Sequence, residues 1–313
     1  MSGAATTGTA SRQRTWRPAW PCEPFDILRG LRRGPGDPTF LLDPDGTIWR
    51  CSRTPAGQVT LRIVRRRADA AIELEAWGAG AEWALDQAPA MLGALDDPSD
   101  FDPADPLVRD AWTRNPHWRV PRTGLVLEAL VAACIEQKVT GQEAFLGWRR
   151  LVRGFGLPAP GPGAERGMLT LPTAEALAHV PSWEWLHCHI DGARSTTIVR
   201  ASRVADSLER TVGLPGDEVE RRLTSLPGVG VWTAAEVRQR AHGDADAVSF
   251  GDYHIARHVG WALTGEDFDD DDLAELLEPY RPHRYRVQHV VTTRLPGRPR
   301  RGPRMAPRRH LPA

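Results

Sequence analysis

One short stretch, Leu226-Pro227-Gly228-Val229-Gly230, constrains the fold more than any other part of this 313-residue chain. It interrupts a helical pattern that ends at Leu223 and resumes from Trp232 to Gln239, so it predicts two helices joined by a tight turn. The two glycines permit positive φ and the close approach of a bulky anion. The helix after the turn begins with unpaired amides at its positive dipole end. The stretch therefore predicts a phosphate-binding hairpin.

A candidate functional carboxylate follows the hairpin. Hydrophobic Val248 and Phe250 lead to Gly251, which bends the chain, and Asp252 then precedes a predicted helix from Tyr253 to Leu263. One interpretation makes Asp252 only the cap of that helix. The other makes it a reactive carboxylate near the phosphate-binding hairpin. The residues alone leave both interpretations open.

The hairpin, the aspartate and the spacing from Gly230 to Asp252 together resemble the helix-hairpin-helix DNA glycosylases. The resemblance implies that a damaged base is flipped out of double-stranded DNA and that Asp252 stabilises the cationic sugar during base removal. It also implies that the backbone around Gly228, Val229, Gly230 and Thr233 holds phosphates. In relatives the hairpin carbonyls bind a sodium, potassium or calcium ion, and the matching carbonyls belong to Thr224, Leu226 and Val229.

Two positions indicate the branch of the family. Relatives that cut the strand place a nucleophilic lysine two residues after the second hairpin glycine, where this chain has Trp232. A tryptophan cannot form a Schiff base, but it can stack on a flipped base. The chain therefore resembles the monofunctional alkylated-base branch, represented by 3-methyladenine glycosylase II. Glu236 stands where that branch has a second pocket aromatic; it either faces the base pocket or lies on the helix surface.

Three further residues correspond to DNA contacts in the family. Gln137 matches a glutamine at a helix junction that fills the gap left by the extruded base. Lys138, the single lysine of the chain, stands where the branch has an apolar wedge, and a solvated helix-end lysine is the alternative. His254 matches a phosphate-contacting histidine, although a surface histidine is the commoner meaning of this pattern.

The periodicity predicts an α+β fold: a small N-terminal antiparallel-sheet domain followed by an all-α glycosylase domain. Alternating apolar residues between 25 and 77 predict the sheet, and periods of three and four predict helices from residue 81 onward. We expect a disordered N-terminus over 1–20, an α/β domain over 21–95 and a helical domain over 96–292. A basic disordered tail is expected over 293–313. Residues 155–172, rich in Pro and Gly, are expected to form a connector without a helix.

Composition restricts the class of protein further. The formal net charge is zero, but it is unevenly spread: residues 266–272 hold six acids, and residues 294–309 hold seven arginines and no acid. Four separated cysteines argue against a disulfide framework, a zinc ribbon or an iron-sulfur cluster, so no cofactor is expected beyond the hairpin ion. They are Cys22, Cys51, Cys134 and Cys188. No signal peptide or apolar span is seen, so we expect a cytoplasmic monomer without a membrane partner.

Two alternatives to an alkylated-base glycosylase remain from the sequence. A glycosylase for oxidised or deaminated bases would use the same hairpin and aspartate. A non-catalytic DNA-binding protein of the same fold would keep the hairpin but would not need Asp252 or an aromatic pocket.

Overall fold

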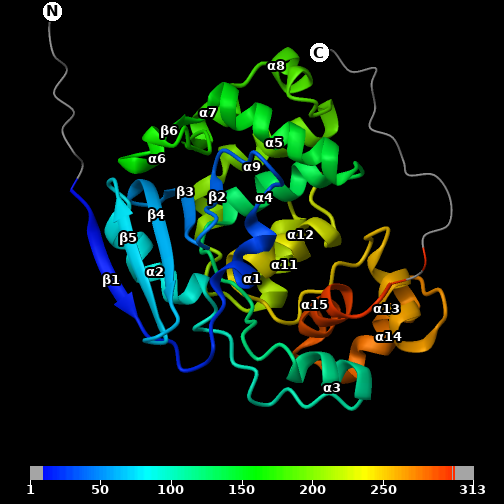
Figure 1. The fold of residues 1–313 in the computed structure, drawn as a ribbon. Coiled ribbons are helices and arrows are strands. Elements are labelled where there is room, and N and C mark those ends of the chain that lie inside the picture. The colour runs from blue at the N-terminus through cyan, green and yellow to red at the C-terminus, as the bar shows by residue number, and fades with distance from the viewer. Residues whose placement is uncertain (1–9, 298, 300–313) are drawn as a thin grey trace, which may run out of the picture.

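The computed structural model describes residues 10–297 and residue 299. The N-terminal part of the chain forms a five-stranded antiparallel sheet in the order β1-β5-β4-β3-β2. The strands are β1 (Arg12–Trp16), β2 (Phe40–Leu42), β3 (Ile48–Thr54), β4 (Gly57–Arg66) and β5 (Ala71–Trp77). Helices make up most of the rest (Figure 1), so the predicted α+β class is confirmed.

The inward face of the sheet explains why the alternating segments form strands. Ile63 lies opposite Ile48 on one neighbouring strand and opposite Leu74 on the other. All three side chains are buried, in a core completed by helices α1 (Pro24–Leu28) and α2 (Ala81–Met91). Cross-strand apolar contacts of this kind fix the register, because a slip of one residue would turn each side chain to the opposite face.

The N-terminal strand corrects one prediction. Residues 12–16 were expected to be disordered, but β1 pairs with β5 from Arg12 opposite Ala76 to Trp16 opposite Ile72. Its first four residues are exposed, so the strand carries little apolar signal. Backbone hydrogen bonds to an existing edge supply the pairing instead. The predicted disorder of residues 1–9 lies outside the described residues.

The helical part of the chain begins after the sheet. A short 3₁₀ turn, η1 (Arg29–Leu31), lies within the N-terminal part. Apart from the connector over 155–172, the elements from residue 106 to 209 are α3 (Pro106–Thr113), α4 (Val126–Glu136), α5 (Gly141–Phe155), α7 (Ala174–His179), α8 (Ser182–His187), α9 (Gly192–Arg203) and α10 (Ala205–Glu209). The later elements are α11 (Gly216–Thr224), α12 (Val231–Val237), η2 (Arg238–His242), α13 (Ile255–Thr264), α14 (Asp270–Leu277), η3 (Glu278–Tyr280) and α15 (Arg284–Arg294).

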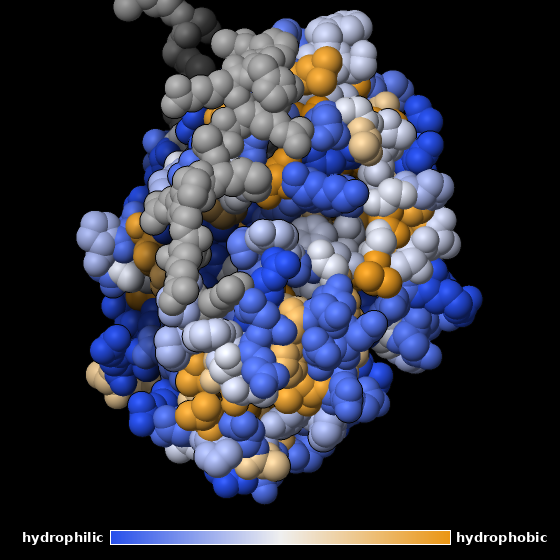
Figure 2. All heavy atoms as spheres, turned by 90° about the vertical axis from the view of Figure 1, so that its right-hand side faces the viewer, coloured by the Kyte–Doolittle hydropathy of each residue, from blue (hydrophilic) through white to orange (hydrophobic). Residues whose placement is uncertain are grey.

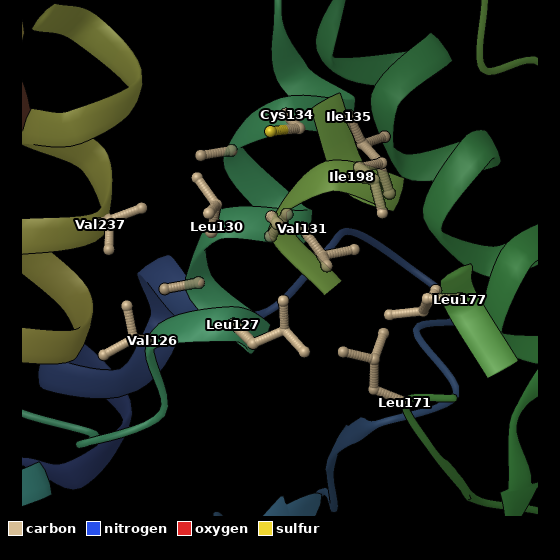
Figure 3. Close-up of a cluster of buried hydrophobic side chains, with 14 of the residues drawn as sticks. Val126, Leu127, Leu130, Val131, Cys134, Ile135, Leu171, Leu177, Ile198 and Val237 are labelled. Carbon is tan, nitrogen blue, oxygen red and sulfur yellow. The ribbon is translucent and has the colours of Figure 1, made fainter. Parts of the chain in front are cut away.

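Helix α4 is the centre of the larger helical core. Val126, Leu130 and Val131 are fully buried, and Figure 3 shows α4 side chains between Val237 of α12 on one side and Ile198 of α9 on the other. A helix covered on so many sides needs apolar residues around most of its circumference. It ends at Glu136, and the turn that follows leads into α5. The helix junction expected at Gln137 is therefore present.

A second helical core forms from segments far apart in the chain. Phe101 and Val108 pack with Val248, Val259 and residues of α14 and α15. These elements lie at the lower right of Figure 1, whereas α4 and its neighbours lie above. The predicted range 96–292 thus contains two hydrophobic cores. The hairpin helices belong to one core and the segment around Asp252 borders the other.

Two expectations for irregular segments are wrong in part. The connector over 155–172 contains a short helix, α6 (Pro162–Glu165), and two paired strands, β6 (Leu157–Pro158) and β7 (Leu169–Thr170). The basic tail was expected to be disordered from residue 293, yet α15 continues to Arg294 and Leu295 packs on the second core. Apolar burial of Leu295 explains the longer ordered end. Residue 298 and residues 300–313 of the predicted tail lie outside the described residues.

Two further features of the structure concern the cysteines and the helices. All four cysteines are buried free thiols, and burial raises the pKa of Cys134 to about 12, so its reactive thiolate form is suppressed. In the described part of the chain, no helix is both long enough and apolar enough to span a bilayer.

Candidate active site

The hairpin between α11 and α12 depends on the two glycines for different reasons. Gly228 has φ +98° and lies against α9: a Cβ there would be 2.0 Å from the Thr197 hydroxyl oxygen. Gly230 has φ −94°, and a Cβ there would meet nothing within 4 Å. Gly228 is therefore required for the fold of the hairpin. Gly230 instead leaves an open approach to the backbone.

The hairpin amides are not equally available to a phosphate. The Val229 amide donates to the Leu226 carbonyl at 3.0 Å within the turn, and the Val229 side chain is buried. The amides of Val231, Trp232 and Thr233 lie in the first turn of α12 and have no intrahelical acceptor. The exposed end of the hairpin thus presents the N-terminus of α12 rather than the Val229 amide.

Gln137 lies against the hairpin. Its Nε2 donates to the Gly228 carbonyl at 3.0 Å and to Thr233 Oγ1 at 2.8 Å. Thr233 is only 2% exposed, and its hydroxyl serves this internal bond. The structure therefore joins three predicted DNA-binding residues into one unit. In it Gln137 braces the hairpin from the end of α4.

Lys138 occupies the exposed turn that follows Gln137. It is one of few non-glycine residues with positive φ, at 52°, between α4 and α5. This left-handed position is unfavourable for a side chain with a Cβ, so the turn is held by its surroundings. Arg194 supplies part of that support, because its guanidinium donates to the Ile135 carbonyl at 2.8 Å. Lys138 thus projects from a braced turn beside the hairpin.

Asp252 occupies a turn between the two helical cores. Its Oδ1 accepts the amide of His254 at 2.8 Å, directly before α13, and the amide of Ile255, the first residue of α13, at 3.1 Å. This oxygen therefore binds the start of α13, although His254 occupies the N-cap position. The other oxygen, Oδ2, accepts the indole N–H of Trp232 at 3.2 Å. The three donors hold the carboxylate in one orientation beside an aromatic ring.

Trp232 reaches Asp252 from the first turn of α12. The residue is only partly exposed, and its ring edge is fixed by the bond to the carboxylate. Gly251 has φ +85°, a left-handed conformation that favours glycine, and a Cβ there would make an ordinary contact with the Trp232 Cβ at 3.8 Å. The predicted catalytic residue and the predicted stacking residue are thus adjacent.

Glu236 faces the interior, one helical turn after Trp232. It is 8% exposed, so the helix-surface interpretation is wrong. Its Oε1 accepts the Ser249 hydroxyl at 2.7 Å, and its Oε2 pairs with Arg240. Both carboxylate oxygens therefore already have protein donors, which removes the reason to expect a hydrogen bond to a base. The pairing with Arg240 follows the local i,i+4 spacing of a helix, whereas no local pattern marks Ser249, 13 residues away, as a partner of Glu236.

His254 and Tyr253 are exposed beside Asp252. His254 contacts the Tyr253 ring edge to face, and the Arg257 guanidinium lies 4.7 Å from the centre of the same ring. Tyr253 is 75% exposed and was missed as a site residue. An aromatic directly after the candidate aspartate was the available signal. Arg200, whose side chain donates to the Pro227 carbonyl at 3.5 Å, was also missed and places an exposed cation beside the hairpin.

One groove of the described structure does not include Trp232 or Asp252. A groove of about 800 Å³ runs along α11, and Val231, Val248 and Phe250 contribute to its lining, but Trp232 and Asp252 do not. Its charged residues are largely paired with one another, as Arg238 is with Glu220 and Asp244. On the face shown in Figure 2, hydrophilic residues predominate and hydrophobic ones form smaller groups. The site around Asp252 is therefore defined by its contacts.

Known proteins resemble this chain in sequence and in fold. No protein-family model matches the chain. A curated relative from Mycobacterium tuberculosis, named "Probable bifunctional transcriptional activator/DNA repair enzyme AlkA", is 32% identical over 195 residues. The match covers 61% of this chain and 38% of that protein, so the chain spans well under half of the relative.

Solved structures share the fold. A 3-methyladenine DNA glycosylase from Archaeoglobus fulgidus superimposes with a TM-score of 0.74 at 18% identity, covering 89% of this chain and 97% of that one. An 8-oxoguanine glycosylase/lyase from Clostridium acetobutylicum gives 0.69 at 13% identity, covering 91% and 98%. At such identities the likeness shows the fold alone. The site residues must indicate the chemistry.

Proposed function

The chain belongs to the helix-hairpin-helix DNA glycosylase superfamily, and we propose that it is a monofunctional DNA glycosylase for alkylated purine bases. It would flip a damaged base out of the duplex and hydrolyse the N-glycosidic bond without cutting the strand. The hydrogen bond between Trp232 and Asp252 carries the proposal. It brings an aromatic surface for a flipped base next to a carboxylate.

The chemistry needs such a carboxylate. As the glycosidic bond breaks, positive charge develops on the sugar, and a fixed negative charge nearby lowers the barrier. Asp252 is suited to this task because three donors orient it before the substrate arrives. It can also orient or deprotonate the attacking water. A base stacked on Trp232 would hold its sugar close to this carboxylate.

The absence of a lysine at position 232 supports the monofunctional assignment. Strand cleavage in lyases proceeds through an amine-sugar Schiff base. Lys138, the single lysine, lies in the turn between α4 and α5 and not in α12. In this proposal Lys138 enters the gap in the duplex, while Gln137 keeps the turn attached to the hairpin.

The hairpin would hold the backbone of double-stranded DNA. The open space at Gly230 and the first amides of α12 suit a phosphate, and Arg200 adds positive charge. Lys138 and His254 are exposed on neighbouring turns and would add contacts. We further propose that the carbonyls of Thr224, Leu226 and Val229 hold a hard cation. Oxygen-only ligands suit sodium, potassium or calcium, although the Leu226 carbonyl already accepts the Val229 amide.

The relatives inform the choice of damaged base. The curated relative and one structural neighbour carry names of DNA repair and of 3-methyladenine removal, and Trp232 offers a surface on which electron-deficient alkylated purines stack well. The paired oxygens of Glu236 remove the main reason to expect recognition of an exocyclic amine. In the proposed organisation, residues 21–95 form the N-terminal domain and residues 96–292 the glycosylase domain. The chain would act as a monomer.

Base release is the direct test. Duplexes that differ only in one nucleotide, carrying 3-methyladenine, 7-methylguanine, hypoxanthine, uracil or 8-oxoguanine, are incubated with the protein, and the free base is quantified. The proposal expects release from the alkylated duplexes first. Release only of 8-oxoguanine or uracil would show that the substrate is an oxidised or deaminated base and not an alkylated one. Tight duplex binding with no release of any base would favour a non-catalytic DNA-binding protein.

A further inference from the structure

A buried hydroxyl lies beneath the turn that carries Asp252. Ser249, three residues before Asp252, is 1% exposed. Its Oγ donates to Glu236 Oε1 at 2.7 Å and accepts Gln239 Nε2 at 2.8 Å and Gln288 Nε2 at 3.1 Å. A hydroxyl has one donor and two acceptor positions, so this one is fully used. Complete satisfaction of a buried polar group indicates a fixed geometry.

The backbone of Ser249 is tied into the same network. Its amide donates to Gln288 Oε1 at 2.9 Å, so the side-chain amide of Gln288 grips both the main chain and the hydroxyl. Its carbonyl accepts the amide of Asp252 at 3.2 Å and closes the turn. The position of Ser249 therefore helps to fix the position of the Asp252 backbone. Gln288 comes from α15, so two elements distant in sequence meet at this residue.

Helix α12 contacts the turn at two points. Trp232 and Glu236 are four residues apart and lie on the same helix face. Trp232 reaches the side chain of Asp252, and Glu236 reaches that of Ser249. Because Ser249 and Asp252 begin and end one turn, the two bonds fix both of its ends relative to α12. These two bonds add to the hold that Gln288 has on Ser249.

An ion pair with Arg240 orients Glu236. Arg240, one helical turn later, pairs with its second oxygen. Burial alone would lower the pKa of Arg240, but the charges of Glu236 and Glu136 outweigh this effect and raise that pKa above its usual value. Glu136 also pairs with Arg33 at 3.1 Å. Arg240 lies in η2, a π-helical turn, and such turns are frequent at functional sites.

We propose that Glu236 and Ser249 are positioning residues that hold the turn of Asp252 against α12, and that Glu236 is not part of the base pocket. This inference rests on the proposed glycosylase function. Misplacement of a reacting group by about 1 Å can cost on the order of a hundredfold in rate. The network would therefore act on the rate of base removal. The hairpin, which binds the duplex, would be unaffected.

The test compares Glu236→Gln and Ser249→Ala with matched controls. Glu220→Gln removes the same charge from another acid paired with an arginine, Arg238, and Ser202→Ala removes another buried serine hydroxyl, which bonds only within α9. Single-turnover base release and duplex affinity are measured for each. We expect the two network variants to lose roughly tenfold to a hundredfold in rate with unchanged affinity. The control variants should keep the wild-type rate and the wild-type duplex affinity.

Hydrogen exchange over residues 248–256 separates this inference from the proposed function. The amides of Ser249 and Asp252 should exchange faster in the network variants than in the wild type or the controls, whether or not any base is released. Equal protection, or equal loss of rate in the controls, would overturn the positioning role. If Ser249→Ala does not fold, Gln288→Met removes both bonds to Ser249 while keeping the side-chain length. Wild-type protein that releases no base refutes the glycosylase proposal, while the exchange result still decides the positioning role.

Discussion

The indole N–H of Trp232 donates a hydrogen bond to Asp252 Oδ2 at 3.2 Å, joining the hairpin helix to the turn before α13. The two residues border different hydrophobic cores, so the contact spans the junction between them. The bond uses the edge of the indole ring and orients the carboxylate. The proposed site is therefore a junction whose parts can be altered one at a time.

Asp252→Asn should abolish base removal and leave duplex binding nearly intact. The amide keeps the size of the carboxylate and can still accept the His254 and Ile255 amides, but it loses the charge that opposes the sugar cation. We expect a loss of at least about a thousandfold in single-turnover rate. Asp270→Asn is the control, because Asp270 accepts the Gly251 amide at 2.8 Å without contacting Asp252. A loss of only a few-fold in Asp252→Asn would contradict the assignment.

Gly228 and Gly230 should respond differently to substitution. Gly228→Ala meets the Thr197 hydroxyl and an unfavourable positive φ, so it should lower the free energy of unfolding by about 1 to 3 kcal/mol. Gly230→Leu meets open space and should fold normally, yet block the approach of a phosphate. Urea unfolding and duplex affinity distinguish the two. Gly230→Leu should weaken binding to duplexes of any sequence, and a change in sequence preference alone would argue against a phosphate site.

Borohydride should trap no covalent complex with a lesion duplex. Trapping requires an amine-sugar Schiff base, and position 232 carries an indole. Product strands should break only after alkali treatment. Lys138→Ala serves as the comparison, since it removes the single lysine. An adduct that forms with the wild type and disappears in this variant would show that Lys138 reaches the sugar, against both the wedge assignment and the monofunctional one.

Acid should destabilise the fold through His289. Burial, with the charges of Arg29, Arg294 and Arg286, lowers the pKa of this residue to about 3, and its ring stacks on Trp118 with centroids 3.8 Å apart. The folded state keeps His289 neutral, so its contribution is complete above the unfolded pKa near 6.5 and is lost as the pH falls toward 3. Between pH 7 and pH 5 the loss should be about 2 kcal/mol. His289→Phe should remove that part of the pH dependence of urea unfolding.

Deletion of residues 298–313 should weaken DNA binding without slowing the chemical step. The cut follows Gly297 because Leu295 packs on the second core and its carbonyl lies 3.2 Å from His258 Nε2. It removes six of the seven arginines between residues 294 and 309. For every phosphate that these arginines neutralise, the deletion should reduce the slope of log affinity against log salt by about 0.9. An unchanged slope would show that these arginines do not bind DNA.

The sequence by itself determined the features that depend on residues close together in the chain. The Pro-Gly-Val-Gly turn expresses a backbone preference. The alternating apolar residues of the strands that contain Ile48 and Ile63 express a local period, as does the apolar circumference of α4. The same local pattern indicated Asp252, because an aspartate after a bend can begin a helix wherever it lies in the fold. The resemblance to one superfamily rested on the spacing of such features.

Only the tertiary structure decided which distant groups meet. Gln137 bonds to Gly228, 91 residues later, and Ser249 to Gln288, 39 residues later. The exposed side chains of β1 gave no apolar signal, since its pairing uses backbone groups that every residue carries. Glu236 was ambiguous because a helical position has no fixed environment until other elements pack on it. A hydrogen bond between distant residues depends on how the cores dock, and that arrangement has no period in the sequence to reveal it.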